Sequence, residues 1–517
     1  DAGPADIHEG IDIQSISVDG RTIQLKAPYY INNRALMVIQ LPRKLTPGKT
    51  LEVQVKWSLP IAKKSTIRNG MYGDKNYFIA YWFPKIAVYD DIVGWDTHSY
   101  TGRYEFYNDF GNYNVEISAP SEYTVWANGI LQNAEEIFTE KYYNRYQKAQ
   151  KSSEAVSIIG EEDRAENAQI QKKGSSHQWK FTLDQTPDFA FSLSKSYYWD
   201  AAMTSNGENN VFVQSAYDPK SKNFYEVCDI LTKMVPYYSE KIPGIPYPYS
   251  QITAFNGGGG MEFPGMVNDG EASTRNKTLY LTAHEVGHSY FPFATGLDEQ
   301  KLAWIDEGLI TFFPRYFSDK FSTSEKRTFF ETMVANYVKE AGSFNDVPMI
   351  YPSENTGIYA YRNHAYNRPA VAYYMLVQEL GEETFFKGIQ LFFKRWEGKH
   401  PKAFDFFNTM NEVSGQDLAW FWKPWFFELG TADMALGIPE SGKLKVHKKG
   451  ELPVPVRLKL YHDDGSTEEI FIKAQRWTET DSNFIEINLP KGNFKKIETD
   501  TKHIPDMNPD DNALIFE

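Results

Sequence analysis

One stretch of thirty residues, LYLTAHEVGHSYFPFATGLDEQKLAWIDEG, constrains this chain more than any other. Its first part, residues 279–291, is predicted to be a helix, which places His284 and His288 on the same face about one turn apart. Glu307 follows His288 after eighteen intervening residues. A fold that uses the three side chains together has to bring Glu307 beside this helix.

The spacing of the two histidines is the spacing that a metal ion needs, and H-E-x-x-H is the arrangement of a zinc hydrolase. Glu285 lies next to the first histidine, close enough to polarise a water without being a ligand. Glu307 would be the third ligand, which leaves the fourth zinc position open for water, as in a catalytic site. The alternative interpretation is two surface histidines beside a solvated glutamate. The downstream WIDEG and the upstream GGGGMEFPG favour the metal site.

The length and net charge of the chain indicate how many domains it has and which binding partners it excludes. A chain of 517 residues is too long for one hydrophobic core and predicts two to four domains. The formal charge of −14 argues against a nucleic-acid surface, which would need a basic stripe. It is compatible with attracting cationic groups such as the free amine of a peptide.

Membrane spans and cysteine chemistry are not predicted. No run of eighteen apolar residues occurs, and the opening DAGPADIHEG lacks the basic and apolar stretches of a signal peptide. Cys228 is the only cysteine, so neither an internal disulfide nor a cysteine-based zinc site is possible. The compartment stays open on these grounds.

Residues 1 to about 200 predict antiparallel β-structure. Apolar and polar residues alternate between turn residues, as in half-exposed strands, in the segments GIDIQSISVDG, RTIQLKA, RALMVIQL, LEVQVKW, YNVEISA and EYTVWANGIL. A polar stretch at about 134–176 interrupts them and is expected to be a helical or mobile surface insertion.

The periodicity changes beyond residue 209. The chain then forms a strand, VFVQSAYDP, and a helix, KNFYEVCDILTKMVPYYSEKI. These lead to the glycine-rich loop GGGGMEFPG and to the helix of His284 and His288, which we call the His helix. Four aromatic-rich helices are then predicted to pack as a helical core: RTFFETMVANYVKEA, RPAVAYYMLVQELG, ETFFKGIQLFFKRW and DFFNTMNEVSG. From about residue 443 short strands return, with DDG as a hairpin turn, and predict a small β-sandwich.

The fold class is therefore multidomain α+β. We expect an N-terminal antiparallel β-sheet domain at 1–203, a zinc catalytic domain with a helical part at 204–436, and a C-terminal β-sandwich at 437–517.

Hydrolysis at such a site follows from the residue types. Neutral His284 and His288 with ionised Glu307 give a net charge of −1 against the +2 of zinc, so the bound water is acidified. Glu285 would accept its proton, and the hydroxide would attack a carbonyl polarised by the metal. Glu285 could then hand the proton to the leaving amine.

The attack also creates an oxyanion that needs a hydrogen-bond donor. The stretch YAYRNHAYNRPAVAYYML supplies candidates that composition alone does not separate: Tyr359, Tyr361, Arg362, His364, Tyr366, Arg368, Tyr373 and Tyr374.

The glycine-rich loop GGGGMEFPG, residues 257–265, lacks the G-K-[ST] ending of a phosphate-binding loop. Its glycines would let the backbone run close to an extended substrate. Glu262 is then either a carboxylate that pairs with a substrate ammonium or a solvated loop residue.

These motifs together resemble one family. HEVGH, eighteen residues and WIDEG are similar to the gluzincin metallopeptidases, and GGMEFP resembles the G-x-M-E-N loop of the aminopeptidase N and leukotriene hydrolase family. YWFPKIAVYDDIVGW, PDFAFSLS, DLAWFWKPWFF and ELPVPVRLKLYHDDG extend the resemblance to about four-fifths of the chain.

The resemblance implies a thermolysin-like catalytic domain and roles for individual residues. His284, His288 and Glu307 would hold one zinc ion, and Glu285 would be the general base. Tyr366, which matches the tyrosine of the family's Y-x-K-G motif in AYNRPAV, would be the oxyanion donor.

Substrate binding is implied in the same way. Glu262 would hold the free N-terminus of a peptide, and Gly259, Gly260 and Met261 would line the cleft.

Several positions depart from the family pattern. Phe263 and Pro264 stand where the loop usually has Asn, and Asp306 replaces the Asn before the third ligand. Pro369 replaces the Gly of Y-x-K-G, and a T-Q-x-E segment, which provides a second amine anchor in the family, is not found.

The sequence thus predicts a zinc aminopeptidase that cleaves the N-terminal peptide bond. The alternatives are a zinc endopeptidase or another zinc hydrolase, and a catalytically silent peptide-binding protein. The resemblance favours a periplasmic or secreted enzyme and leaves a cytoplasmic one open. The preferred N-terminal residue and the oligomeric state are not predicted.

Overall fold

The computed structural model describes residues 10–33, 35–63, 67–100, 104–105, 107–323 and 328–516. Residues 1–9, most of the segment DAGPADIHEG in which the sequence shows no signal-peptide pattern, lie outside these ranges. Among the described residues no helix has both the length and the apolar character needed to cross a bilayer. The chain forms two compact units, the first of residues 1–239 and 246–296, the second of residues 240–245 and 297–517. The division into three domains that is expected from the sequence stays a prediction.

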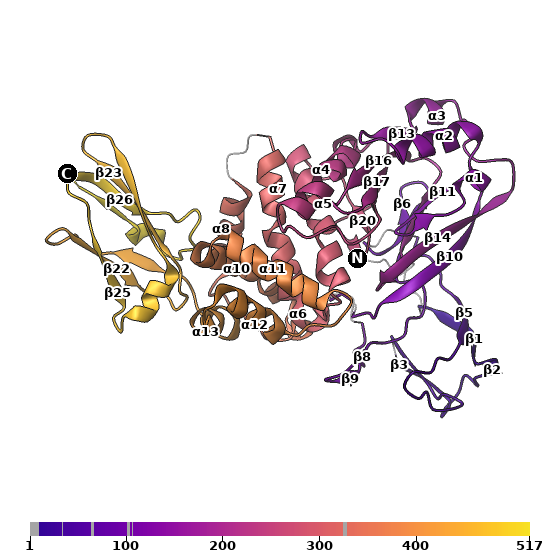
Figure 1. Ribbon diagram of the computed structural model, residues 1–517, viewed down its shortest axis with the longest axis horizontal. Helices are drawn as coiled ribbons and strands as arrows, with labels where there is room; N and C mark the ends of the chain where they lie inside the picture. The colour runs from indigo at the N-terminus through magenta and orange to yellow at the C-terminus, as the bar shows by residue number, and fades with distance from the viewer. Residues whose placement is uncertain are drawn as a thin grey trace. The chain divides into compact units, whose positions relative to one another are not determined.

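The N-terminal part of the first unit is built from several antiparallel sheets, as expected (Figure 1). One sheet has the order β2 (Arg21–Thr22), β1 (Asp12–Val18), β5 (Val53–Ser58). A second has the order β10 (Gly111–Pro120), β14 (Ser176–Thr186), β12 (Ile130–Leu131). A third has the order β11 (Thr124–Ala127), β15 (Phe191–Ser194), β7 (Asn76–Ile79), β6 (Asn69–Tyr72).

Two strand pairs complete this region, β3 (Tyr30–Asn33) with β4 (Leu36–Ile39), and β8 (Tyr89–Asp90) with β9 (Gly94–Trp95). The predicted strand RTIQLKA is only two residues long in the structure. It ends early because the backbone N–H of Lys26 bonds to the carbonyl of Gln24 and that of Tyr29 to Lys26, which turns the chain.

The polar insertion is more than a surface appendage. It forms α1 (Ala134–Ile137), α2 (Glu140–Ala149), β13 (Val156–Ile159) and α3 (Glu161–Ala165). Strand β13 pairs with β16 at the edge of the large sheet, and the ring of Tyr146 lies 5.8 Å from that of Trp199. Apolar residues that are spaced through the polar sequence therefore pack part of this segment into the hydrophobic core.

A six-stranded mixed sheet carries the rest of the first unit, in the order β13, β16 (Tyr198–Ser205), β17 (Asn210–Tyr217), β18 (Gln251–Asn256), β20 (Met266–Asp269), β19 (Glu262–Phe263). Strands β17, β18 and β20 are parallel, and β19 is a short antiparallel edge. The helices α4 (Val227–Glu240) and α5 (Arg275–Gly287) belong to this unit, and α5 packs against β20 (Figure 1).

The second unit begins with a helical part, whose aromatic faces are buried as the sequence predicts. The helices are α6 (Glu299–Phe312), α7 (Pro314–Phe321), α8 (Phe329–Glu340), α9 (Ile358–Tyr361), α10 (Arg368–Leu380), α11 (Glu382–Trp396), α12 (Ala403–Ser414) and α13 (Ala419–Trp422). Trp304 shows the packing: its ring lies 5.4 Å from Phe407 and 4.9 Å from Phe426.

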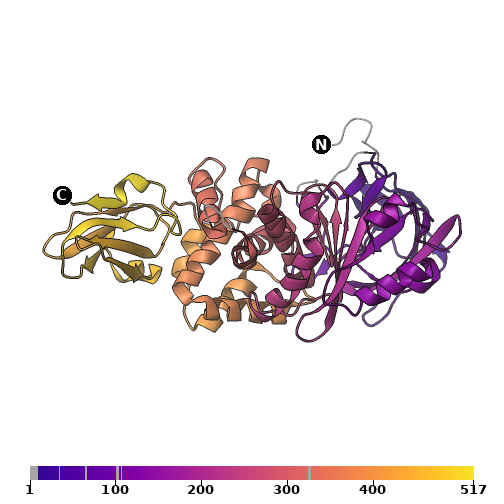
Figure 2. The ribbon, with the colours of Figure 1, turned by 90° about the horizontal axis from the view of Figure 1, so that it is seen from above.

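The C-terminal strands, yellow in Figure 2, form two antiparallel sheets. One has the order β21 (Met434–Leu436), β22 (Lys443–Lys448), β25 (Phe484–Asn488), and the other β24 (Thr467–Ile472), β23 (Val456–His462), β26 (Phe494–Thr499), β27 (Ala513–Ile515). The DDG hairpin joins β23 to β24, with Gly465 at φ +87°. The predicted strand EEIFIKAQRW is wrong in its second half, where residues 474–479 form a 3₁₀-helix.

Candidate metal and substrate site

The His helix α5 is fixed at both ends by its own sequence. Thr274 caps it, since the Thr274 hydroxyl accepts from the backbone N–H of Lys277. The helix ends at Gly287, and a π-helical turn, η3 (Ser289–Ala294), follows. The expected helix to residue 291 is therefore too long, because Phe291 precedes a proline and adopts an extended conformation (φ −133°, ψ 115°).

Two hydrogen bonds join the part of α5 next to His284 to the neighbouring elements α4 and β20. The Tyr238 hydroxyl of α4 donates to the carbonyl of Ala283 at 2.8 Å, and the Thr282 hydroxyl donates to the Asp269 carboxylate of β20 at 3.1 Å. The α5 residues in these bonds, Thr282 and Ala283, directly precede His284 in the sequence. The Nε2 atoms of His284 and His288 are 3.3 Å apart, which confirms that the two rings share one face.

Glu307 lies on α6, and the Tyr366 hydroxyl hydrogen-bonds to its carboxylate. Helices α6 and α10 approach closely because Gly308 of α6 has no side chain. A Cβ there would lie 2.6 Å from Cβ of Pro369, the residue that replaces the glycine of the family motif. The Tyr373 hydroxyl also donates to the carbonyl of Trp304, which ties α10 to α6.

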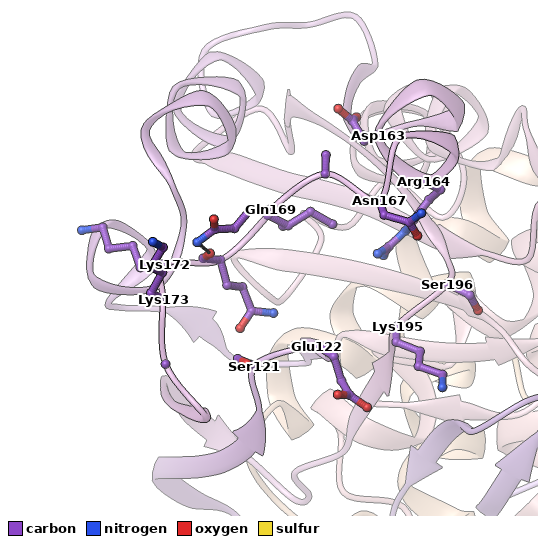
Figure 3. A pocket seen from close by; sticks show the side chains of 14 residues that line it. Ser121, Glu122, Asp163, Arg164, Asn167, Gln169, Lys172, Lys173, Lys195 and Ser196 are labelled. Atoms are coloured by element: carbon purple, nitrogen blue, oxygen red, sulfur yellow. Dashed lines mark hydrogen bonds between the residues drawn. The ribbon is translucent and has the colours of Figure 1, made fainter.

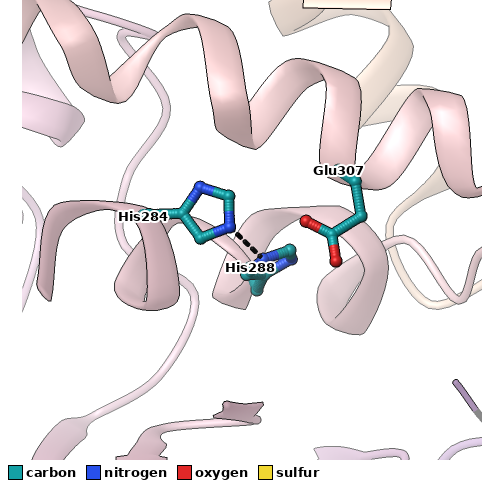
Figure 4. A group of neighbouring side chains, drawn as sticks. All are labelled: His284, His288 and Glu307. Carbon is teal, nitrogen blue, oxygen red and sulfur yellow. Dashed lines mark hydrogen bonds between the residues drawn. The ribbon is translucent and has the colours of Figure 1, made fainter. Parts of the chain in front are cut away.

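One nitrogen from each of His284 and His288 and one carboxylate oxygen of Glu307 all lie within 4.8 Å of one another (Figure 4). Two imidazoles and one carboxylate form a donor set that zinc takes in catalytic sites, with room left for a fourth ligand. The residues therefore fit a zinc ion in both chemistry and spacing.

Glu285 is buried beside the glycine-rich loop. A Cβ on Gly260 would lie 2.3 Å from the Glu285 carboxylate and 2.6 Å from Cδ1 of Leu281. The absence of a side chain at Gly260 is thus what gives the carboxylate its place. Gly259, at φ +94°, adopts a conformation that favours glycine.

Glu262 and Phe263 form the edge strand β19 and point to opposite faces of it. The Phe263 ring packs 5.0 Å from Phe78 and 5.6 Å from Tyr81. Phe263 therefore fills the core of the N-terminal sheets and leaves the other face to Glu262, which is buried. Met261, the residue before this strand, accepts a backbone hydrogen bond from Asn268.

The structure adds Asp306 to the candidates. Polar atoms of Glu262, His288 and Asp306 also lie within 4.8 Å of one another, so the carboxylate of Glu262 is close to a predicted metal ligand. Asp306 is fully buried. The sequence carried a signal for it, since Asp306 precedes Glu307 where the family usually has Asn.

Three of the candidate oxyanion donors are committed elsewhere. The guanidinium of Arg368 is fully buried and bonded to Asp346, and the Tyr373 hydroxyl is used by Trp304. Burial lowers the pKa of His364 to about 4, and its Nε2 is 2.9 Å from the carbonyl of Tyr351. Tyr366 is the candidate whose hydroxyl bonds to Glu307.

A polar hollow of about 620 Å³ lies beside the insertion (Figure 3). Many of its charges hold the insertion together. Asp163 accepts from Lys141 and Arg145, Arg164 donates twice to the carbonyl of Tyr197, and Lys172 donates to that of Glu135. Burial raises the pKa of Asp163, but the hydrogen bonds that it accepts from the Gly160 backbone N–H, Lys141 and Arg145 outweigh this and hold the pKa well below its usual range. The bonded charges of the hollow thus have a structural role, and its lining also includes Ser121, Glu122, Lys195 and Ser196 outside the insertion.

Residues 228–425 match the sequence profile described as Peptidase family M1 domain. This stretch is a peptidase family M1 domain. It contains the His helix, the glycine-rich loop, Glu307 and Tyr366. The family predicted from the sequence motifs is confirmed.

Curated relatives of the M1 domain are aminopeptidases. Aminopeptidase 2 of Candida albicans is 21% identical over 329 residues, which cover 58% of this chain and 35% of that protein. Aminopeptidase N of Escherichia coli is 28% identical over 154 residues, which cover 28% of this chain and 17% of that protein. The chain thus matches about a third or less of the length of these relatives.

Solved structures share the fold. The M1 zinc metallopeptidase from Deinococcus radiodurans superposes with a TM-score of 0.57 and 13% identity, covering 83% of this chain and 85% of that one. Legionella pneumophila aminopeptidase A in complex with aspartic acid gives a TM-score of 0.63 and 16% identity, covering 95% of this chain and 54% of that one. The multidomain α+β class predicted from sequence is confirmed.

Proposed function

We propose that the chain is a zinc-dependent aminopeptidase that hydrolyses the N-terminal peptide bond of peptides. The observation that carries the proposal is the grouping of His284, His288 and Glu307 within 4.8 Å. The M1 domain and its aminopeptidase relatives support it.

His284, His288 and Glu307 would hold the ion. Bound there, zinc supplies a Lewis acid that polarises a carbonyl and makes a water more acidic. The ligands are well suited to this because the imidazoles are neutral and Glu307 adds a single negative charge. The Tyr366 hydroxyl, bonded to Glu307, orients that carboxylate.

Glu285 moves the proton. Its carboxylate takes a proton from the attacking water as the oxygen bonds to the peptide carbonyl carbon. When the C–N bond breaks, Glu285 passes that proton to the departing amine, so one residue is base and then acid. Burial against Gly260 keeps the carboxylate in one position for both transfers.

Tyr366 stabilises the oxyanion that forms on the carbonyl oxygen. Its phenol hydroxyl would give up the hydrogen bond to Glu307 and donate to the oxyanion instead. The nearby alternatives Arg368, Tyr373 and His364 are bonded to backbone carbonyls of the fold. Removing one such donor typically costs about 10²–10³ in kcat.

Glu262 makes the reaction an exopeptidase reaction. Its buried carboxylate would pair with the ammonium group of the substrate, and Gly259, Gly260 and Met261 would run along the first residue. Because an ammonium held near His288 fixes which carbonyl reaches the site, only the first peptide bond is cleaved. Peptides with a free N-terminus are therefore the substrates.

A panel of peptides with free and acetylated N-termini tests the proposal, together with zinc analysis and a zinc chelator. We expect about one zinc per chain, cleavage of the first bond of free peptides, loss of cleavage with chelator, and poor cleavage of acetylated peptides. Equal cleavage of both kinds would favour an endopeptidase, and zinc binding without hydrolysis would favour a silent peptide-binding protein.

Glu262→Ala separates the amine anchor from the hydrolytic centre. It is expected to lose activity on free peptides while zinc stays bound. Equal loss on free and acetylated peptides would reject the anchor role.

A further inference from the structure

Tyr366 belongs to a π-helical turn, η5 (Arg362–Asn367), and one residue before Tyr366 and one after it bond to the same buried carboxylate. Oδ1 of Asp346 accepts from the Asn363 side-chain amide at 3.0 Å and from the Arg368 guanidinium at 3.0 Å. Asn363 precedes Tyr366 by three residues, and Arg368 follows it by two. The tyrosine is thus held from either side.

The Arg368 end of this contact is fixed by further bonds. The guanidinium is fully buried, and besides Asp346 it donates to three backbone carbonyls, those of Pro424, Trp425 and Glu428. A buried charge is costly to move unless all its partners move with it. Arg368 therefore anchors the turn to the chain beyond α13.

The Asp346 end is equally constrained. Its Oδ2 accepts from the backbone N–H of Gly342 at 3.1 Å, and its side chain is only 3% exposed. His364 adds a third tie, since its ring contacts the carbonyl of Tyr351. The turn is therefore fastened to the segment between α8 and η4 (Ser353–Asn355).

Such fastening matters because π-helical turns are rare and less regular than α-helical ones. We propose that Asp346 is a positioning residue for the reaction, which acts through Asn363 and Arg368 to hold the Tyr366 hydroxyl at Glu307. This inference rests on the proposed role of Tyr366 as oxyanion donor. Loosening the turn should slow the chemical step and leave substrate binding nearly unchanged.

Two variants test the contact at different strengths. Asp346→Asn removes the charge opposite Arg368, and Asn363→Ala removes one hydrogen bond while leaving the buried ion pair intact. The second variant keeps the test informative if the first does not fold. Asp506→Asn is the matched control, since Asp506 is also buried and accepts backbone hydrogen bonds from Met434 and Asn508.

Hydrogen–deuterium exchange tests the fastening without reference to activity. We expect amides of residues 362–368 to exchange faster in Asn363→Ala and Asp346→Asn than in the wild type, and at the wild-type rate in Asp506→Asn. Unchanged exchange in a folded Asn363→Ala chain would overturn the proposal even if the chain is no aminopeptidase.

Steady-state kinetics tests the action through Tyr366. Asn363→Ala should lower kcat about tenfold, less than the hundredfold loss that a displacement of about 1 Å can cause, with KM within about twofold. The same substitution in a Tyr366→Phe background should lower kcat less than about twofold further, because the positioned hydroxyl is already absent.

Equal losses in the two backgrounds would show that the contact between Asn363 and Asp346 has a merely structural role, and would overturn the proposal. If Tyr366→Phe itself keeps full activity, the assigned role of Tyr366 fails, and the positioning role fails with it. In that case the exchange result still reports whether the turn is fastened.

Discussion

Gly260→Ala is the sharpest test of how the glycine-rich loop serves the site. A methyl group there would lie 2.3 Å from Oε1 of Glu285, while ordinary contact begins at 3.4 Å. The oxygen has to retreat by about 1.1 Å, the difference between these distances. Leu281, whose Cδ1 would be 2.6 Å away, blocks one direction of relief.

A displacement of about 1 Å at a reacting group can cost about 10²-fold in rate. We therefore expect kcat to fall about a hundredfold. Zinc content should stay at the wild-type level, because the methyl group meets none of the three predicted ligands. The global fold should also persist, since φ at Gly260 lies outside the left-handed region.

The assay is hydrolysis of an aminoacyl reporter, with zinc analysis and thermal unfolding on the same samples. Gly111→Ala is the control, because a Cβ there would meet only Tyr113 at the ordinary contact distance of 3.7 Å. Retention of more than half of the wild-type kcat by a folded, zinc-loaded Gly260→Ala chain would refute the reasoning, since Glu285 would not depend on the loop.

Three further predictions concern single side chains. Glu285→Gln should abolish hydrolysis of the aminoacyl reporter while zinc stays bound. Full activity of this variant would contradict the proton-transfer role of Glu285. Gly308→Ala should destabilise the chain by about 1–3 kcal/mol by overpacking against Pro369, measured by urea unfolding, and an unchanged stability would contradict the close approach of α6 and α10. His364 makes stability depend on pH: burial lowers its pKa from 6.5 to about 4, so the unfolded chain binds the proton first and stability falls as pH drops from 6.5 towards 4. This amounts to about 2 kcal/mol between pH 7 and 5, which His364→Gln should remove, and an identical pH dependence of the variant would contradict it.

The parts of the site that the sequence predicted are those with a local pattern. His284 and His288 share a face because the helix period places them there, and the metal grouping with Glu307 follows from the WIDEG motif. The helical core was equally predictable, since its aromatic residues recur at helical spacing.

The parts that were missed depend on contacts between distant segments. Nothing in the sequence around Asp346 indicates that it bonds to Asn363 and Arg368. The sequence makes Arg368 itself a candidate oxyanion donor, and only its burial removes it from the candidates. The polar composition of the insertion predicts a surface segment, whereas a few apolar residues such as Ile158 and Ile159 are buried and pack it into the core.

The packing of the glycine-rich loop limits which substitutions the loop itself can accept. Added side chains would collide at three of its four consecutive glycines: Gly257 with Asn268 at 2.0 Å, Gly259 with Ile67 at 2.8 Å, and Gly260 with Glu285. Gly270 is confined in turn, because a Cβ there would lie 2.8 Å from the backbone nitrogen of Gly259. Natural variation or engineering that alters substrate preference therefore has to act on neighbours that face the loop, such as Ile67 and Leu281, while the loop itself stays fixed.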